Sequence, residues 1–100
     1  MPAPREHDIK CRHDFFEHVW IGDKTFELRK DDRHYQVGDV LLLRETALKP
    51  DRIPRWIRAR VTYVLSGEPW LARDYVAMSI RVFERGGLTL PSPTLPKPGQ

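Results

Sequence analysis

The stretch RWIRARVTYVL, residues 55–65, decides the fold of this chain. Apolar residues occupy every second position in most of it, and cationic or polar residues lie between them. This period of two is typical of a β-strand with one face toward a core. The face expected to point inward consists of Ile57, Ala59, Val61, Tyr63 and Leu65. The face expected to display its side chains outside consists of Trp56, Arg58, Arg60 and Thr62.

Four more segments have strand patterns, and turn residues separate some of them. The segments are residues 7–12, 25–30, 40–45 and 75–83, of which the first is the weakest and the last is apolar on both parities. Gly38-Asp39 and the run Gly67-Glu68-Pro69 are typical of turns. The sequence therefore predicts five strands.

One short helix is predicted for residues 15–21. Asp14 has the position of an N-cap, Phe16 and Val19 share an apolar face, and Gly22 follows the last helical residue. No second long helix is available for parallel crossovers, so the sheet is expected to be largely antiparallel. The predicted fold is mainly β: a small, mostly antiparallel barrel, or a curled sheet with the helix plugging its end.

Length and composition favour one domain. The chain has 100 residues, 40% of them hydrophobic and 31% charged, which suits one core and is too short for two. We expect a flexible N-terminus at residues 1–6, an ordered domain at residues 7–85 and a flexible Pro/Gly-rich tail at residues 86–100. No apolar run approaches the ~20 residues of a membrane span. A cytoplasmic protein without a membrane partner is therefore the default expectation.

No metal or other cofactor is predicted. Cys11 is the only cysteine, and the histidines have no recognised ligand spacing. The chain also lacks a glycine-rich loop of the kind that cradles phosphates, and it lacks the turn that carries a nucleophilic serine. These absences argue against nucleoside triphosphate chemistry and against a Ser/His/Asp triad.

Arginines concentrate in one part of the chain. The formal net charge is only +3, but residues 52–60 contain four arginines and no acid. We call Arg55, Arg58 and Arg60, together with Trp56, the arginine stripe. It fits backbone phosphates with a base stacked on the tryptophan. The alternative is a solvated strand face whose arginine stems cover apolar surface, although the lack of interleaved acids favours nucleic acid.

The run GDKTFELRK, residues 22–30, gathers three charged groups near one mouth of the predicted sheet. In a partly dry cleft the pKa of Lys24 would fall, so that its amine transfers a proton. Glu27 suits activation of a water or a hydrogen bond from a base amine, and Arg29 suits a phosphate. The alternative is an ion-pair network of these three residues that closes the mouth without a ligand.

The order Gly-x-Lys-x-x-Glu-x-Arg after a short helix, followed by Gly38-Asp39 before an apolar strand, resembles the ASCH domain of the PUA-like superfamily of small β-barrels. Within that superfamily, the chain is similar to a compact bacterial and phage branch known only as a domain of unknown function. The stretches that carry the similarity are HDIKCRHDFFEHVWIGDKTFELRKDDRHYQVGDVLLLRE and YVAMSI. The resemblance covers residues 7–83. It implies a cleft between helix and barrel in a superfamily that binds RNA or modified nucleotides.

The same resemblance implies a hydrolase activity as the alternative to binding alone. Some ASCH relatives deacetylate N4-acetylcytidine, and others are described as ribonucleases. Lys24 matches the lysine that the amidohydrolases use, whereas Glu27 stands where they have a threonine. A hydrolase with Lys24 and Glu27 as catalytic residues is therefore the alternative to a protein that only binds RNA or a modified nucleoside.

The expected binding site extends beyond the motif. Lys24, Glu27 and Arg29 form its centre, and the arginine stripe extends the footprint. Tyr35, in the loop before Gly38, either stacks on the ligand or packs at the barrel rim. A third interpretation is a phage-type interaction module that binds a host protein through its barrel and its proline-rich tail. The sequence leaves the oligomeric state open.

Overall fold

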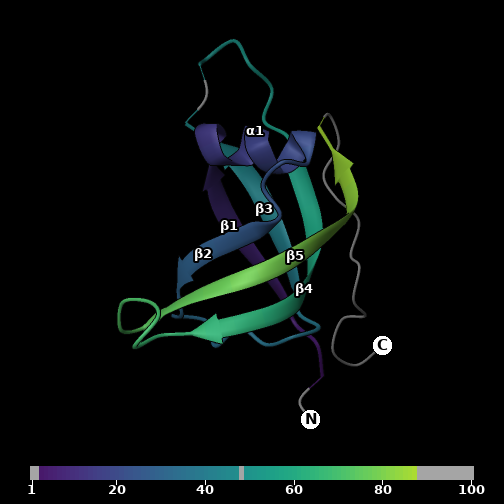
Figure 1. Ribbon diagram of the computed structural model, residues 1–100. Coiled ribbons are helices and arrows are strands. Elements are labelled where there is room, and N and C mark those ends of the chain that lie inside the picture. Colours follow the sequence, from purple (N-terminus) through teal and green to yellow (C-terminus); the bar gives the residue numbers. More distant parts are fainter. Residues whose placement is uncertain (1–2, 48, 88–100) are drawn as a thin grey trace.

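Figure 1 shows the computed structural model, which describes residues 3–47 and 49–87. Along the chain the elements are β1 (Glu6–Arg12), α1 (His13–Ile21), β2 (Phe26–Lys30), β3 (Val40–Thr46), β4 (Trp56–Ser66) and β5 (Tyr75–Gly86). Each predicted strand corresponds to an observed one, and the predicted helix corresponds to α1. The mainly β fold with one short helix is therefore confirmed.

The strands form one curled sheet in the order β1-β3-β4-β5-β2. β1 and β3 are parallel, and the ladders β3·β4, β4·β5 and β5·β2 are antiparallel. The largely antiparallel sheet is confirmed, with a parallel edge pair that the sequence pattern did not indicate. Because β1 and β2 are the two edges, the curled sheet is open between them, and α1 lies across one end (Figure 1).

The core lies inside the curl. The sheet contributes Ile9, Cys11, Leu41, Leu43, Ile57, Ala59, Val61, Val76, Met78 and Ile80. From α1, Phe16 and Val19 join them and are 0% and 3% exposed. A helix of nine residues is unstable alone, so burial of these two side chains holds α1 on the end of the sheet.

α1 begins two residues earlier than predicted, because β1 runs directly into it. Arg12 is the N-cap and makes no side-chain cap hydrogen bond, so the N-cap role predicted for Asp14 is wrong. Asp14 instead lies in the first turn, where its Oδ1 accepts the N–H of Phe15 at 3.2 Å. At the other end, Gly22 has a φ of 92° and its N–H donates to carbonyls of the last turn. It ends the helix as predicted, since other residues are strained at this φ.

Two irregularities interrupt the ladder between β4 and β5: the first leaves an extra residue on β5, and the second leaves an extra residue on β4, where it changes the face that the following residues occupy. The register with β5 shifts between Arg58 and Ala59 and again between Val61 and Tyr63. A β-bulge adds one residue to a strand, so the inward–outward alternation is reset beyond it. The alternation predicts Tyr63 inward, but Tyr63 is 61% exposed. The strict period of two is therefore wrong for the second half of β4.

Both ends of the ordered domain extend slightly beyond the predicted limits. β1 begins at Glu6 and β5 continues to Gly86. Most of the predicted tail, from residue 88 on, lies outside the described residues. Within the described part of the chain, no helix is long and apolar enough to cross a membrane.

Candidate functional site

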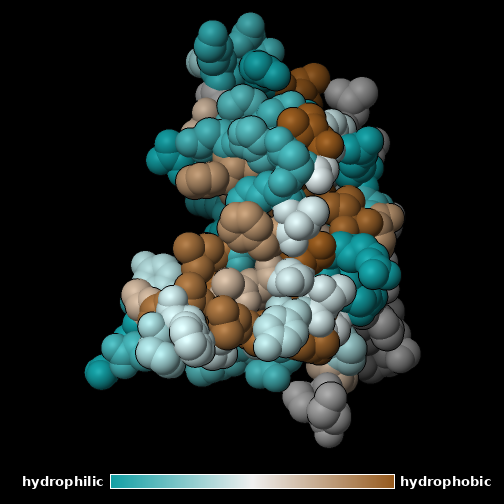
Figure 2. All heavy atoms as spheres, viewed as in Figure 1, coloured by the Kyte–Doolittle hydropathy of each residue, from teal (hydrophilic) through white to brown (hydrophobic). Residues whose placement is uncertain are grey.

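A pocket of about 430 Å³ lies between the two edge strands β1 and β2. In Figure 2 the surface is hollowed on the left, at the level between α1 and β2 of Figure 1. The lining comprises Lys10, Cys11 and Arg12 of β1, Phe15 of α1, Lys24, the whole of β2 and Tyr75 of β5. The predicted residues Lys24, Glu27 and Arg29 therefore line one open pocket.

The local structure explains how these three side chains reach the pocket. The alternation of β2 turns Glu27 inward, where it is 3% exposed, while Phe26 points outward and is 50% exposed. Arg29 lies two residues beyond Glu27 and shares its face. Lys24 precedes the strand, and its backbone N–H donates to the His18 carbonyl at 3.0 Å. This hydrogen bond ties the lysine to the end of α1.

Glu27 is the centre of an ion-pair network. Lys24 Nζ donates to Glu27 Oε1 at 2.7 Å and to the Phe26 carbonyl at 2.8 Å. Arg29 Nε donates to Glu27 Oε2 at 3.0 Å, and Arg29 Nη2 donates to the Lys10 carbonyl at 2.8 Å. Arg29 thus bridges the opening between the edge strands. The ion-pair network considered from the sequence is present, and the pocket stays open beside it.

The network retains unused hydrogen-bonding capacity. Within the described residues, Lys24 uses two of the three N–H donors of an ammonium group. Each oxygen of Glu27 accepts one hydrogen bond, although a carboxylate offers about four lone-pair sites. A ligand in the pocket can therefore bind both groups without breaking their contact with each other.

Positive charge exceeds negative charge around the pocket. Five cationic side chains, those of Lys10, Arg12, Lys24, Arg29 and Lys30, line it together with one carboxylate, that of Glu27. Arg12 also binds Asp14, at 3.3 Å on the exposed surface, and such an exposed pair is weak. The remaining excess favours an anionic ligand.

Exposed aromatic rings border the same pocket. Phe15, Phe26 and Tyr75 are 54%, 50% and 41% exposed. Lys24 Nζ lies 4.9 Å from the centroid of the Phe26 ring and 5.9 Å from that of Phe15, within the range of cation–π contacts. Flat apolar surfaces beside cations are suited to a ligand that has an aromatic ring and a negative charge.

Cys11 lies at the inner wall but is not a nucleophile. The side chain is buried, and this burial, with the carboxylate of Glu27 nearby, raises the pKa of the thiol to about 11. The thiolate is the reactive form of cysteine. At neutral pH the thiol is therefore protonated and inert, and it acts as a small core residue.

Arg58 of the arginine stripe is not displayed to solvent. It is 2% exposed, with Nε donating to Glu6 Oε1 at 2.8 Å and Nη1 donating to Glu84 Oε1. Burial lowers its pKa, but the bonds to Glu84 and Glu6 outweigh that effect and raise it. The expectation of an open cation here is wrong, because β1 and β5 supply acids that the local sequence lacks.

Arg55 is likewise neutralised by distant acids. Its Nε donates to Glu45 Oε1 at 3.0 Å, and its Nη2 donates to Glu45 Oε2 at 2.9 Å and to Glu17 Oε2 at 2.5 Å. The guanidinium also lies over the rings of Phe16 and Trp20, 5.3 and 4.6 Å from their centroids. Arg55 therefore joins α1 to β3.

Trp56 and Arg60 complete the stripe. Trp56 is half-buried and lies across Gly86 of β5, where a Cβ in place of the glycine hydrogen would come within 2.7 Å of the indole Cζ2. Arg60 is exposed, donates from Nη1 to the Gly38 carbonyl at 2.7 Å and lies 5.6 Å from the centroid of Phe83. Of the three arginines in the stripe, only Arg60 presents its charge to solvent.

Tyr35 packs in the core and not on the pocket. It is 4% exposed, and its ring meets the His7 ring edge-on with centroids 4.8 Å apart. Burial raises the pKa of its hydroxyl. Of the two roles considered from the sequence, the structure places Tyr35 as a packing residue beside β1.

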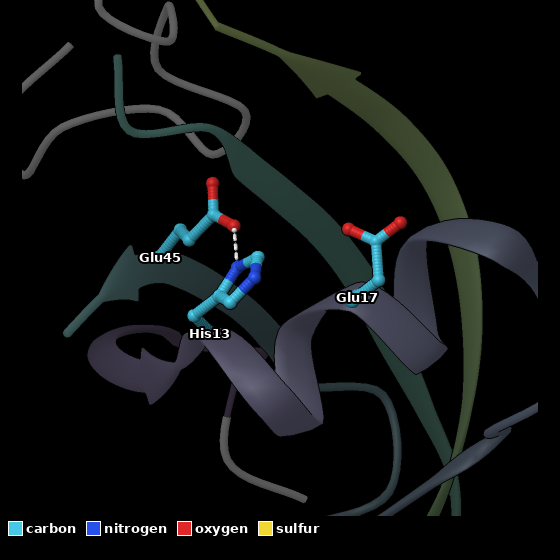
Figure 3. Close-up of side chains that lie close together, drawn as sticks. All are labelled: His13, Glu17 and Glu45. Carbon is cyan, nitrogen blue, oxygen red and sulfur yellow. Dashed lines mark hydrogen bonds and ion pairs between the residues drawn. The ribbon is translucent and has the colours of Figure 1, made fainter. Parts of the chain in front are cut away.

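A second group of potential ligand atoms lies between α1 and the end of β3. His13, Glu17 and Glu45 offer atoms within 4.8 Å of one another (Figure 3). His13 Nδ1 is 2.7 Å from Glu45 Oε2, and Arg55 binds both carboxylates. The guanidinium already supplies the positive charge that a metal ion would bring. The donor set therefore fits an ion-pair network better than a metal centre.

The sequence patterns did not single out several pocket residues. Lys10 and Arg12 occupy the outward parity of β1, and Phe26 occupies the outward parity of β2. Alternation alone assigns such residues to a surface. Only the curl of the sheet, which brings β1 and β2 to opposite sides of one opening, shows that they share a pocket.

The fold and pocket define a small curled-sheet domain with a cationic, aromatic-edged site. The chain belongs to the DUF3850 family, described as a domain of unknown function, whose model matches residues 6–80. The match includes nearly all of the pocket-forming strands. The chain is also 38% identical over 72 residues to an uncharacterized 12.9 kDa protein in the GpA 3' region of Escherichia phage P2. That alignment covers 72% of this chain and 64% of the phage protein.

Proposed function

We propose that the pocket between β1 and β2 binds one nucleotide unit of RNA or a modified nucleoside. The observation that carries the proposal is the joint presence of five cationic side chains and three exposed aromatic rings around one pocket. A relation to the ASCH domain is part of the proposal. It is supported by the position of the pocket beside α1, with Lys24, Glu27 and Arg29 lining it.

Each part of the pocket suits one part of a nucleotide. Phe15 and Phe26 offer faces on which a base stacks. Glu27, held by two cations, accepts a hydrogen bond from an exocyclic amine through its remaining lone pairs. Lys10 and Lys30, both exposed and on opposite lips of the opening, attract the phosphate. The pocket volume of about 430 Å³ lies within the usual range for small-molecule sites.

The test compares charge reversals inside and outside the pocket. We expect Lys10→Glu with Lys30→Glu to weaken binding of a labelled ten-nucleotide single-stranded RNA by tenfold or more in fluorescence anisotropy at low salt. Lys49→Glu with Arg52→Glu makes the same change of charge in the exposed β3–β4 loop, away from this pocket. An equal loss in both double variants would mean that only net charge matters, and it would refute the pocket as the binding site.

A second candidate function is hydrolysis of an acylated nucleoside. The observation that favours it is the 2.7 Å contact of Lys24 Nζ with Glu27 Oε1 at an open pocket, which places a proton donor and an acceptor within reach of one ligand. Water would attack the acyl carbon as Glu27 takes one of its protons, the C–N bond would break, and the amine would leave with a proton from Lys24. The products are a carboxylate and the free base amine.

Acetate release from N4-acetylcytidine tests this candidate directly. We expect turnover by the wild-type chain and its loss in Lys24→Gln, which retains a hydrogen-bond donor for Glu27 but cannot act as an acid. Circular dichroism shows whether the variant is folded. Absence of turnover in the folded wild-type protein would eliminate this amidohydrolase activity and leave the binding proposal in place.

A further inference from the structure

The outer face of β2, β5 and β4 from Arg60 onward carries exposed aromatic side chains. The strand register places Phe26, Ser79 and Tyr63 in one row across the three strands. Phe26 and Tyr63 are 50% and 61% exposed. Figure 2 shows brown and pale side chains across the front of the molecule over these strands. We call the following residues the outer platform: Phe26, Tyr63, Tyr75, Phe83, Arg60 and Arg81.

This face is more apolar than the solvated side of an antiparallel sheet usually is. In β5, Val76, Met78 and Ile80 point into the core, yet Tyr75 and Phe83 on the other face are 41% and 45% exposed. The core does not need these rings, because it is already filled from the inner face. Apolar side chains gathered on an exposed face mark an interaction site.

Two arginines of the platform lie directly opposite each other. Arg60 of β4 pairs in register with Arg81 of β5, and both side chains are exposed. Among the described residues neither makes an ion pair, and Arg60 donates only to the Gly38 carbonyl. Like charges in directly opposed positions destabilise a sheet. An anionic partner would remove this repulsion, so the charge pattern favours an occupant with negative groups between aromatic contacts.

A second copy of the chain fits this face poorly. Stacking two platforms would bring two further uncompensated arginines against the first pair, with no acid of the platform to offset them. Single-stranded nucleic acid matches both features, because its bases stack on aromatic rings and its phosphates bind arginine. The platform therefore resembles a stacking surface for a polyanion more than a protein interface.

The platform is continuous with the pocket. Phe26 and Tyr75 belong to both, and Lys30 lies opposite Tyr75 in the register of β2 with β5. From β4 to β2 the sheet spans about 10 Å, since neighbouring strands are about 4.8 Å apart. That width corresponds to about three stacked nucleotides at about 3.4 Å each.

We propose that the outer platform is the track along which single-stranded RNA reaches the pocket. Bases stack on Tyr63 and Phe83, phosphates contact Arg60 and Arg81, and the strand crosses the edge of β2 so that one nucleotide enters the pocket. The inference rests on the proposed function of the pocket. It adds a substrate class, because the track binds an oligonucleotide and not a single nucleoside.

The first test uses an aromatic residue that belongs to the platform alone. The full chain is titrated into a fluorescein-labelled single-stranded RNA of ten mixed nucleotides and, by competition, against a nucleoside monophosphate. We expect Tyr63→Ser to lower the affinity for the oligonucleotide about tenfold and to leave the affinity for the monophosphate unchanged. Ile53→Ser, which removes a side chain of 60% exposure in the β3–β4 loop, should change neither affinity.

The second test uses the opposed arginines. We expect Arg60→Gln with Arg81→Gln to reduce the slope of log affinity against log salt by about 1.4, the value for two phosphate contacts on a single strand. Lys49→Gln with Arg52→Gln is the matched control in the exposed loop. Thermal melts show that each variant is folded.

The outcomes separate the two proposals. If Tyr63→Ser binds the oligonucleotide as tightly as the wild type does, the platform proposal is overturned. The pocket would still be supported if the wild type binds the monophosphate and the double variant Lys10→Glu with Lys30→Glu does not. Oligonucleotide binding that depends on Tyr63, without any monophosphate binding, overturns the pocket and therefore the track into it, and leaves the platform only as a separate RNA-binding surface. If the wild type does not bind RNA but forms a dimer in light scattering, and Tyr63→Ser abolishes that dimer, the platform is an interface between two copies of the chain and the RNA proposal is overturned.

Discussion

The two halves of the outer sheet surface differ in whether ion pairs neutralise their arginines. On the half formed by β1, β3, the beginning of β4 and the end of β5, Arg58 is buried between Glu6 and Glu84. On the half formed by β2, most of β5 and β4 from Arg60 onward, Arg60 and Arg81 face each other without an ion pair among the described residues. Two strands contribute to both halves: β4 supplies Arg58 and Arg60, and β5 supplies Glu84 and Arg81. The first half is closed by ion pairs, and the second is open to a partner.

A row of arginines in a sequence therefore does not define one surface. Arg58 and Arg60 are two residues apart, yet the register shift after Arg58 places them in different surroundings. Arg58 lies opposite Leu42, a buried residue outside the main core cluster. Its stem covers apolar surface, whereas Arg60 lies over the exposed ring of Phe83.

The largest effect should come from breaking the closed half. We expect Arg58→Ala to lower the free energy of unfolding by about 3 kcal/mol, because it leaves two carboxylates without their cation and uncovers Leu42. Arg60→Ala should change it by less than about 0.5 kcal/mol, as is usual for an exposed side chain. Urea denaturation measures both, and equal losses would contradict the division of the surface into two halves.

Acid should also destabilise the network around α1 and the ends of β3 and β4. Burial raises the pKa of Glu45, but hydrogen bonds from Arg55 and His13 outweigh it and lower the value from 4.5 to about 2. Because the folded-state pKa is depressed, the stabilisation is present above about pH 5 and is lost as the pH falls toward 2. We expect a loss of about 2 kcal/mol at pH 3 relative to pH 7 from this group.

Variants isolate that contribution in denaturation curves recorded at pH 7 and pH 3. Glu45→Gln should be less stable at pH 7 and should lose less stability on acidification than the wild type. Glu68→Gln is the control, because Glu68 is exposed and lies 3.9 Å from an exposed arginine. If both variants kept the acid sensitivity of the wild type, Glu45 would not be its source.

The smallest effect should come from the open half. We expect Arg81→Glu to raise the free energy of unfolding by about 0.5 kcal/mol, because it replaces a like-charge pair with an opposite-charge pair across β4 and β5. Arg81→Gln should give a smaller gain, since it only removes the repulsion. Thermal melts at low salt measure the difference, and a loss of stability in both variants would show that Arg81 is already compensated.

Much of the fold could be predicted from local patterns. Alternating or continuous apolar runs located the strands, and the apolar face before Gly22 located the helix, because these signals depend on neighbouring residues. The N-cap was misassigned to Asp14, because α1 continues directly from β1 without a loop. Tyr63 was misassigned to the core, because a bulge leaves no clear mark in an alternating sequence.

The candidate site could also be predicted only in part from local patterns. Lys24, Glu27 and Arg29 could be grouped from the sequence, because they lie within six residues of one another in a single segment. Their shared pocket with Lys10 could not be predicted, since Lys10 lies 19 residues from Arg29 and reaches it only across the opening of the sheet. The neutralisation of Arg58 by Glu6 could not be predicted either, because the two residues lie 52 positions apart in the chain.

Local sequence patterns specified the strands, the helix and the charged motif of β2, because each depends on contacts between residues that are near in the chain. Contacts between distant segments set which arginines are neutralised, where the pocket opens and which face of β4 carries Tyr63. Those features depend on strand order, on register and on the curl that brings β1 and β2 to one opening. Such long-range pairings are set by the packing of the whole sheet, and no local pattern encodes them.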